Sequence, residues 1–115
     1  MTVVPARGQV WLADLEPTRG HEQGGRRPAV IVSSQALNRS RARLVIALPL
    51  TTRERPLPTR VRVEPPDGGV QETSFICCEH IRTLSTERWS AQPFGSVSLA
   101  TLDQVDEILQ LLLGP

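Results

Sequence analysis

The sequence predicts a mainly β protein, in which short antiparallel strands curl into a small barrel and one helix follows at the C-terminus. Three observations lead to this prediction. Short apolar stretches between residues 10 and 84 have the composition or the two-residue alternation of strands. Turn-forming glycines and prolines separate these stretches. Only residues 99–113 repeat their apolar side chains with the period of a helix.

The length of 115 residues predicts one domain, residues 1–115, built around a single core. No apolar run approaches membrane-spanning length, and the N-terminal residues lack the basic start and the long apolar stretch of a signal peptide. We therefore expect a cytoplasmic protein that does not enter a membrane.

The first two predicted strands enclose a charged loop. Residues 10–15 alternate in the way that is typical of a half-buried strand, and residues 29–32 form a β-branched run that suits a more fully covered strand. The loop between them holds three glycines, which let the backbone turn sharply, together with Glu22, Arg26 and Arg27. A charged loop held between two strands predicts an anion-handling site.

The middle of the chain predicts one more strand and a second charged loop. Residues 33–41 can form one helical turn or a loop. Residues 44–50 have the composition of a buried strand, and Pro49 marks the end of this strand or the edge of a sheet. Residues 51–58 form a polar loop rich in arginine.

Residues 59–64 alternate cleanly, which predicts a strand with Val61 and Val63 inward and with Arg60 and Arg62 on an exposed face. A turn follows at the Pro-Pro-Asp-Gly-Gly segment, and further strands are expected at residues 73–77 and 81–84.

The predicted helix spans residues 99–113, with Ser98 as its cap and Gly114 at its end. Three consecutive leucines make its last turn apolar almost all round, so we expect this end to bury against a second copy in a twofold dimer. The expected apolar stripe consists of Leu99, Leu102, Val105, Ile108, Leu109 and Leu112.

The only cysteines, Cys77 and Cys78, are adjacent, and we interpret them as two small residues on opposite faces of a strand. Neither histidine is paired with a second ligand at helical spacing, so the sequence predicts no metal site and no cofactor.

Charge is segregated along the chain. Residues 19–62 hold ten arginines and two glutamates, whereas residues 63–115 hold two arginines and eight acidic residues. The net charge of +1 conceals this asymmetry. The basic half predicts either a surface that binds a phosphate backbone or a solvated face.

Taken together, these motifs resemble the MazF/PemK family of toxin–antitoxin ribonucleases. The resemblance runs nearly from end to end, through RGQVWLADL, GHEQGGRRPAVIVS, PLTTRERPLPTRV, EHIRTLS and VDEILQLLLG. It implies an SH3-like barrel of the PemK/CcdB type, a homodimer and metal-independent cleavage of single-stranded RNA at short sequence motifs. It also implies a cognate MazE-like antitoxin whose extended tail occupies the RNA groove.

Without a metal, the ribose 2′-OH attacks the adjacent phosphorus and leaves a 2′,3′-cyclic phosphate and a 5′-OH. Two other functions stay open for this fold. One is a non-catalytic toxin that binds DNA gyrase, and the other is an inactive barrel that binds RNA or sequesters an antitoxin.

The resemblance implies that Arg27 and Thr51 are catalytic and that Glu22 and Gln23 contact the substrate. The planar fork of Arg27 and the hydroxyl of Thr51 can stabilise the charge of a phosphorane. Arginine is not a practical base, whereas Glu22 or His80 is better suited to be one. Of the two, Glu22 is expected to assist proton removal or to orient Arg27. An ion pair between Glu22 and Arg26 or Arg27 is an equally open role.

His80 stands where relatives usually have glutamine, so it either reads a base or is a histidine at the edge of the core. Arg82 either lines the groove or braces the barrel. With four aromatic residues in the chain, stacked bases would have few platforms, and arginine planes and backbone groups are expected to do more of the reading. The full set of expected RNA-binding residues is Gln23, Arg26, Thr52, Arg53, Arg55, Glu79, His80 and Arg82.

Overall fold

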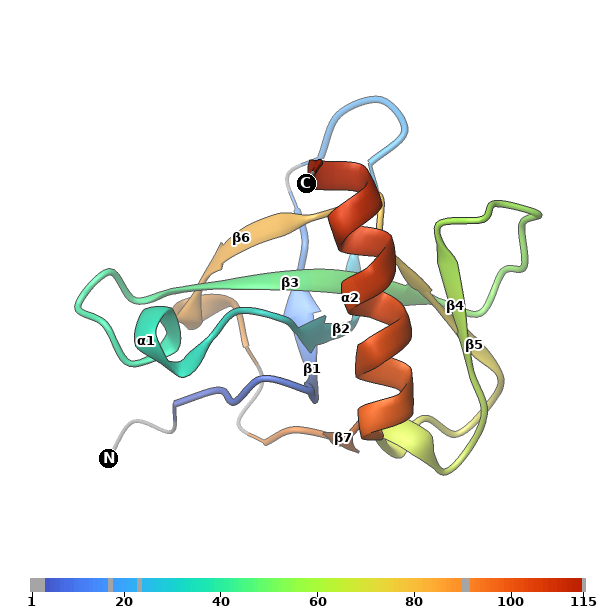
Figure 1. The fold of residues 1–115 in the computed structure, drawn as a ribbon. Helices are drawn as coiled ribbons and strands as arrows, with labels where there is room; N and C mark the ends of the chain where they lie inside the picture. The colour runs from blue at the N-terminus through green and yellow to red at the C-terminus, as the bar shows by residue number, and fades with distance from the viewer. Residues whose placement is uncertain (1–3, 17, 23, 90–91, 115) are drawn as a thin grey trace.

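The computed structural model describes residues 4–16, 18–22, 24–89 and 92–114. Within them the chain forms seven β-strands, two α-helices and two short 3₁₀ turns (Figure 1). The predicted mainly β fold with a C-terminal helix is confirmed. In chain order the elements are β1 (Gln9–Asp14), β2 (Arg26–Ile31), α1 (Gln35–Asn38), β3 (Leu44–Thr51), β4 (Arg60–Val63), β5 (Ser74–Cys77), β6 (Arg82–Ser85), β7 (Gly95–Ser96) and α2 (Leu99–Leu113).

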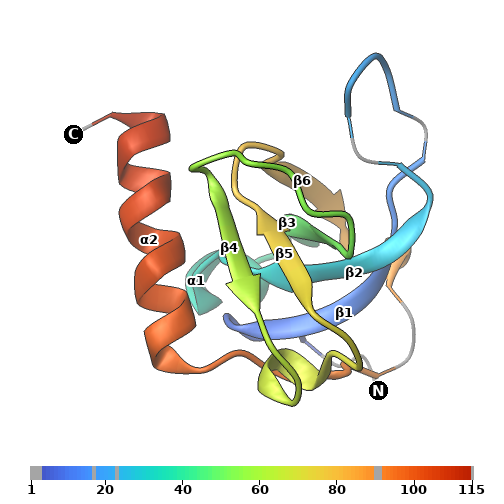
Figure 2. The ribbon, with the colours of Figure 1, turned by 90° about the vertical axis from the view of Figure 1, so that its right-hand side faces the viewer.

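The strands form one antiparallel sheet in the order β4-β5-β3-β2-β1-β7, and β6 also pairs with β3. The sheet is curled, and α2 lies beside β4 (Figure 2). Because β4 and β7 remain as edges, the curled sheet is a half-barrel and not a closed barrel. β3 is the central strand, since it pairs with β2, β5 and β6. The ends of β3 therefore decide which loops lie close together.

The sheet buries apolar side chains in two clusters. Val10 of β1 belongs to one cluster, and Trp11 and Ala13 belong to the other. The prediction that this strand is half buried is wrong, because all three side chains are at most 2% exposed. Alternation in the sequence distinguishes the two faces of a strand, but it does not show that a curled sheet covers both of them.

Pro49 was expected at the end of its strand or at a sheet edge, and this prediction is also wrong. β3 continues through Pro49 to Thr51 at the centre of the sheet. On one side, β3 pairs with β6 over residues 44–47 and with β5 over residues 50–51. Pro49 lies between these two partners, where the absence of an N–H donor is tolerated.

α2 begins at the predicted cap. The Ser98 hydroxyl accepts a hydrogen bond of 3.2 Å from the Thr101 N–H, and the Ser98 N–H donates to Asp67 at 2.7 Å. Leu102 and Val105 are buried against the sheet. No helix in the described residues is long and apolar enough to cross a membrane.

The apolar stripe of α2 extends beyond the surface that the sheet covers. Leu99 and Leu112 were expected in this stripe, but they are 79% and 41% exposed. Leu111 and Leu113 are 83% and 73% exposed. A contact between this end of the helix and a second subunit stays a prediction.

Cys77 and Cys78 are buried and form no disulfide. Burial raises the pKa of the Cys77 thiol to about 11 and that of the Cys78 thiol to about 12. Both thiols are therefore protonated at neutral pH and act as small core side chains, as the sequence suggested. The prediction that both lie on a strand is wrong for Cys78, because β5 ends at Cys77 and Cys78 lies in the turn that follows.

We predict that Leu48→Ala lowers the free energy of unfolding by about 2–5 kcal/mol, because Leu48 is fully buried on the central strand and alanine leaves a cavity. Urea unfolding followed by circular dichroism measures the change. The control is Leu99→Ala on the exposed face of α2, which should stay within about 0.5 kcal/mol of the parent chain. Equal losses in the two variants would contradict this account of the core.

Candidate functional site

A cavity of about 510 Å³ lies where β2 begins and β3 ends. Arg27 and Thr51 both line it, although 24 positions of the sequence separate them. The antiparallel register explains their approach: Ala29 pairs with Pro49, and the same register continued by two residues places Arg27 opposite Thr51. The other lining residues are Pro28, Leu50, Thr52, Arg53, Arg55, Arg60 and Ser74.

The side chain of Arg27 is held on one edge and open on the other. Its Nε donates a hydrogen bond of 2.7 Å to the carbonyl oxygen of Gly24. The loop carrying Gly24 is itself anchored, because the Glu16 carboxylate accepts from the N–H of Gly25 at 2.7 Å. Among the described residues, no hydrogen bond or ion pair involves the two terminal nitrogens of Arg27. These nitrogens can therefore donate to an anion in the cavity.

Thr51 ends β3 with its hydroxyl positioned as a donor. Its Oγ1 accepts a hydrogen bond of 3.2 Å from the N–H of Arg53. Because that contact uses a lone pair, the hydroxyl hydrogen remains available to donate to a substrate. The next residues, Thr52, Arg53 and Arg55, are exposed and line the same cavity, so the predicted loop contacts are brought to the site.

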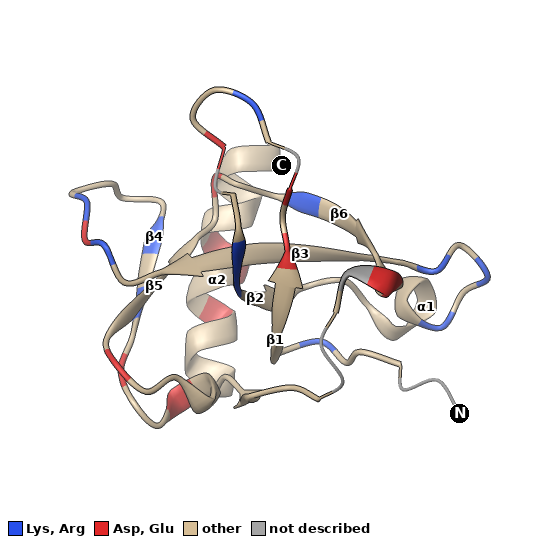
Figure 3. Cartoon of the chain, turned by 180° about the vertical axis from the view of Figure 1, so that it is seen from behind, with Lys and Arg blue, Asp and Glu red and all other residues tan. Residues whose placement is uncertain are grey.

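Only part of the basic half of the chain serves this cavity. The arginines at residues 39–43 lie before β3, whereas Arg53 and Arg55 lie after it (Figure 3). An eight-residue strand separates the two groups by about 25 Å. Of the described residues, four arginines and no acidic residue line the cavity. The predicted anion-binding character is thus concentrated at one end of β3.

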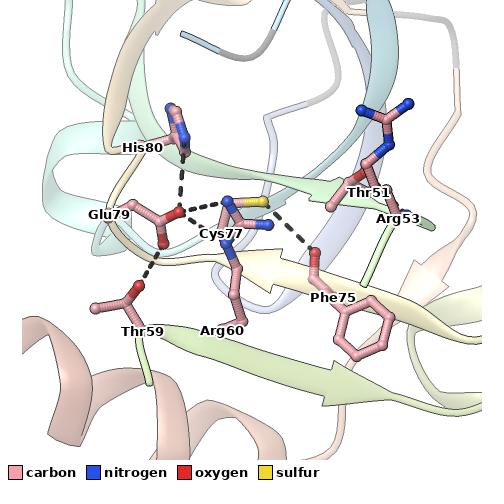
Figure 4. Close-up of polar contacts among 8 residues, drawn as sticks. All are labelled: Thr51, Arg53, Thr59, Arg60, Phe75, Cys77, Glu79 and His80. Atoms are coloured by element: carbon pink, nitrogen blue, oxygen red, sulfur yellow. Dashed lines mark hydrogen bonds and ion pairs between the residues drawn. The ribbon is translucent and has the colours of Figure 1, made fainter. Parts of the chain in front are cut away.

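Arg60 was expected on an exposed strand face, and this prediction is wrong. Its side chain is 3% exposed and lines the cavity. Its Nε donates to Oε2 of Glu79 at 2.7 Å, and one terminal nitrogen lies 2.6 Å from the same oxygen (Figure 4). Alternation placed Arg60 correctly on the face opposite Val61 and Val63, but curling of the sheet turns this face toward the cavity and Glu79. Arg62, two residues on, is 63% exposed as predicted.

Glu79 was expected to bind RNA, yet the described contacts occupy both of its carboxylate oxygens. Oε1 accepts a hydrogen bond of 2.7 Å from the Thr59 hydroxyl, and Oε2 accepts from Arg60. Burial alone would raise the pKa of this carboxyl group, but the hydrogen bonds from Arg60 and Thr59 outweigh burial and lower it. Glu79 therefore stays charged at neutral pH and holds Arg60 beside the cavity.

His80 and Glu79 do not line the cavity. The Nε2 atom of His80 is 3.6 Å from the Glu79 carboxylate. Burial lowers the pKa of His80, and this effect exceeds the opposing attraction of Glu79. His80 is therefore mainly neutral at pH 7.

Other predicted site residues do not line the cavity or lie outside the described residues. Glu22 is exposed and accepts a hydrogen bond of 2.6 Å from the N–H of Arg19, and the described contacts include no ion pair between it and Arg26 or Arg27. Arg26 is exposed outside the cavity. Arg82 donates to the carbonyl oxygen of Leu15 at 3.2 Å, so it braces the barrel. Gln23 lies outside the described residues.

Ser74 is a lining residue that the sequence analysis missed. It is 6% exposed at the start of β5, and its hydroxyl donates to the carbonyl oxygen of Glu72. No local pattern distinguishes such a serine from an ordinary one at the start of a strand. Within the described residues there is no cluster of three or more histidine, cysteine or acidic side chains that could hold a metal ion.

Comparison with known proteins gives consistent matches over nearly the whole chain. Residues 6–113 match the family model of the PemK-like, MazF-like toxin of type II toxin–antitoxin systems. The chain is 38% identical over 112 residues to the endoribonuclease MazF9 of Mycobacterium tuberculosis, covering 93% of this chain and 94% of that protein. It is 34% identical over 113 residues to the endoribonuclease EndoA of Bacillus subtilis, covering 97% of each.

Solved structures agree with this result. The crystal structure of MazF from Deinococcus radiodurans superposes with a TM-score of 0.87 at 30% identity, covering 99% of this chain and 100% of that one. A mycobacterial endoribonuclease in complex with its cognate antitoxin superposes with a TM-score of 0.79 at 34% identity, covering 96% and 95% of the two chains.

We predict that Glu79→Gln lowers the free energy of unfolding at pH 7 by about 1.5–3 kcal/mol, because it removes a charged acceptor from Arg60. The folded-state pKa of Glu79 is lowered, so its stabilising contribution is present above the usual glutamate value of about 4.3 and is lost as the pH falls through the folded value. Urea unfolding at a series of pH values should show the two proteins converging in acid.

The matched control is Glu72→Gln, which alters an exposed carboxylate outside this ion pair and should have little effect at any pH. A loss in Glu79→Gln that does not depend on pH would show that the charge of Glu79 is not what stabilises the fold.

Proposed function

The chain belongs to the family of PemK-like, MazF-like toxins of type II toxin–antitoxin systems, and we propose that it is an endoribonuclease toxin that cleaves single-stranded RNA at short sequence motifs. The reaction we propose needs no metal. The ribose 2′-OH attacks the adjacent phosphorus, the bond to the 5′-oxygen breaks, and the products carry a 2′,3′-cyclic phosphate and a 5′-OH. We place this activity in the cytoplasm.

The observation that supports this proposal best is that Arg27 and Thr51 line one cavity. The two terminal nitrogens of Arg27 make no hydrogen bond or ion pair with the described residues and can donate, and the Thr51 hydroxyl has a hydrogen to donate. In-line attack builds negative charge on the non-bridging phosphate oxygens, and donors already in place stabilise this charge without reorganising. Arg53 and Arg55, on the exposed loop, are suited to hold neighbouring phosphates.

Proton transfer requires a group other than Arg27, because arginine stays protonated in proteins. We propose that Glu22 removes the proton from the 2′-OH. Glu22 is exposed on the same loop that holds the Arg27 side chain. Binding of RNA would have to release its hydrogen bond with the Arg19 N–H.

The partners follow from the family. We propose that a cognate MazE-like antitoxin neutralises this toxin, since the matched structures include an endoribonuclease with its cognate antitoxin and a MazE–MazF complex from Deinococcus radiodurans. We also propose a homodimer in which the exposed leucines of the last turn of α2 are covered by the second copy.

Purified protein incubated with a long single-stranded RNA in EDTA should produce discrete cuts with 5′-OH ends. A single 2′-deoxy substitution on the 5′ side of a mapped cut should abolish cleavage there, because it removes the attacking oxygen. Cuts that persist at the substituted position, or that disappear in EDTA, would contradict the mechanism. Inhibition of DNA supercoiling with no RNA cleavage would favour a gyrase-binding toxin.

Arg27→Ala and Thr51→Val should each lower the single-turnover cleavage rate by about 10²–10³-fold, because each removes a donor to the phosphorane. The melting temperature should change little, since Arg27 is only half buried beside a loop and valine suits a strand. Arg62→Ala removes a 63% exposed arginine outside the cavity and should cleave like the parent chain. Equal rates in Arg27→Ala and Arg62→Ala would exclude a catalytic role for Arg27.

Glu22→Gln should remove the acidic limb of the pH–rate profile of single-turnover cleavage if Glu22 is the base. The rate of the parent chain should fall on the acidic side of the profile, whereas the variant should be slow there and should not depend on pH. A variant whose acidic limb is unchanged would assign the proton transfer to another group.

A further inference from the structure

A second pocket, of about 260 Å³, adjoins the arginine-lined cavity. It shares Pro28, Thr52 and Ser74 with that cavity, so the two hollows are neighbours, and together they are named the groove. The remaining lining residues of this second pocket are Gly69, Val70, Gln71, Glu72 and Phe94.

The charge of the groove reverses between its two parts. Four arginines line the cavity, whereas the second pocket has one carboxylate, Glu72, and no basic residue. A phosphate is attracted to the first part and repelled from the second. A nucleotide lying along the groove therefore places its phosphate against the arginines and its uncharged base in the second pocket. Glu72 and Gln71 offer a carboxylate and an amide that can bond the donors of a base edge.

An exposed aromatic ring lines the second pocket. The chain has four aromatic residues, and three of them are engaged in the core: Trp11 is 2% exposed, Phe75 is 8% exposed, and Trp89 packs against Trp11 with ring centroids 6.3 Å apart. Phe94, in contrast, is 49% exposed. A base has two flat faces, and stacking one of them on an aromatic ring is the usual way in which proteins hold unpaired bases.

The backbone that carries Phe94 is fixed. Its N–H donates a hydrogen bond of 2.7 Å to the carbonyl oxygen of Val10 on β1. Gly69 packs directly against it, so closely that a Cβ atom at position 69 would lie 2.2 Å from the Phe94 carbonyl oxygen. A ring on a backbone held in this way loses little conformational freedom when a ligand binds.

We propose that the second pocket is a nucleobase subsite, in which one base of the bound RNA stacks on Phe94 while Gln71 and Glu72 bond its edge. This inference rests on the proposed endoribonuclease function and adds a specificity-determining residue to it. Base reading then combines one aromatic platform with the arginines, whereas the sequence alone favoured arginine planes and backbone groups.

The test begins with a short RNA that contains one mapped cleavage site. Each nucleotide beside the cut is replaced in turn by an abasic residue, which keeps the backbone and removes the base. Values of kcat/KM are then measured for the parent chain, Phe94→Leu and Phe94→Tyr. Leu99→Ala is the control for loss of an exposed apolar side chain elsewhere, and thermal melting verifies that each variant is folded.

At one position, the abasic substitution should lower kcat/KM of the parent chain by about 5- to 150-fold. Phe94→Leu should show a loss of similar size on intact RNA and no further loss with the abasic residue at that position. At all other positions, the abasic losses should be equal in the two proteins. Phe94→Tyr keeps the ring and should recover most of the activity, and Leu99→Ala should match the parent chain.

The subsite would be overturned if Phe94→Leu had the kcat/KM of the parent chain. It would also be overturned if the loss from Phe94→Leu and the loss from the abasic residue added at every position. The pocket would then be a protein contact or a surface hollow. Failure of the parent chain to cut any RNA would instead contradict the proposed function. The subsite is then decided by binding of an oligonucleotide that contains 2-aminopurine. Transfer of this base from its neighbours to the Phe94 ring should change its fluorescence in the parent chain and not in Phe94→Leu, and the absence of this difference overturns the inference.

Discussion

The antiparallel register between β2 and β3 is the constraint on which the site depends. Ala29 pairs with Pro49 through the backbone. The same register, continued by two residues, places Arg27 opposite Thr51, and both side chains line the cavity. A slip of one residue would turn the side chains of β2 to the other face of the sheet. Ala29 and Ile31 are buried in one core cluster and Val30 in the other, so a slip would exchange their side chains between the clusters and disturb the packing of both. The register that fills the core is therefore also the register that places the two catalytic candidates.

The arginines that line the cavity differ in exposure and in how they are held. Arg53 and Arg55 stand on an exposed loop, where they can follow an RNA backbone. Arg60 is buried and immobilised by Glu79, whose carboxylate is in turn held by Thr59. A buried ion pair contributes little net stability, but loss of one partner leaves a charge uncompensated. Glu79 thus serves the site indirectly, by keeping a positive charge in the cavity wall.

Charge also orders the groove along its length. The arginines line one hollow, and the adjoining hollow is lined by one aromatic ring and one carboxylate. Phosphates and bases have opposite preferences for these surroundings. In the proposed complex, this distribution of charge favours a phosphate beside the arginines and a base in the second pocket.

Local patterns were sufficient to identify β1 to β6, the C-terminal helix with its cap at Ser98, and the charged loop ending in Arg27, because alternation, helical periodicity and capping act between residues close in the chain. The two-residue strand β7 was missed, because it is too short to show any alternation. The partners of Arg60, Arg82 and Glu79 could not be inferred in this way. Each of them contacts a group 19 or more positions away. Which face of a strand becomes a cavity wall, and which carboxylate meets which guanidinium group, depends on how the sheet curls, and that curl arises only when all the strands pack together.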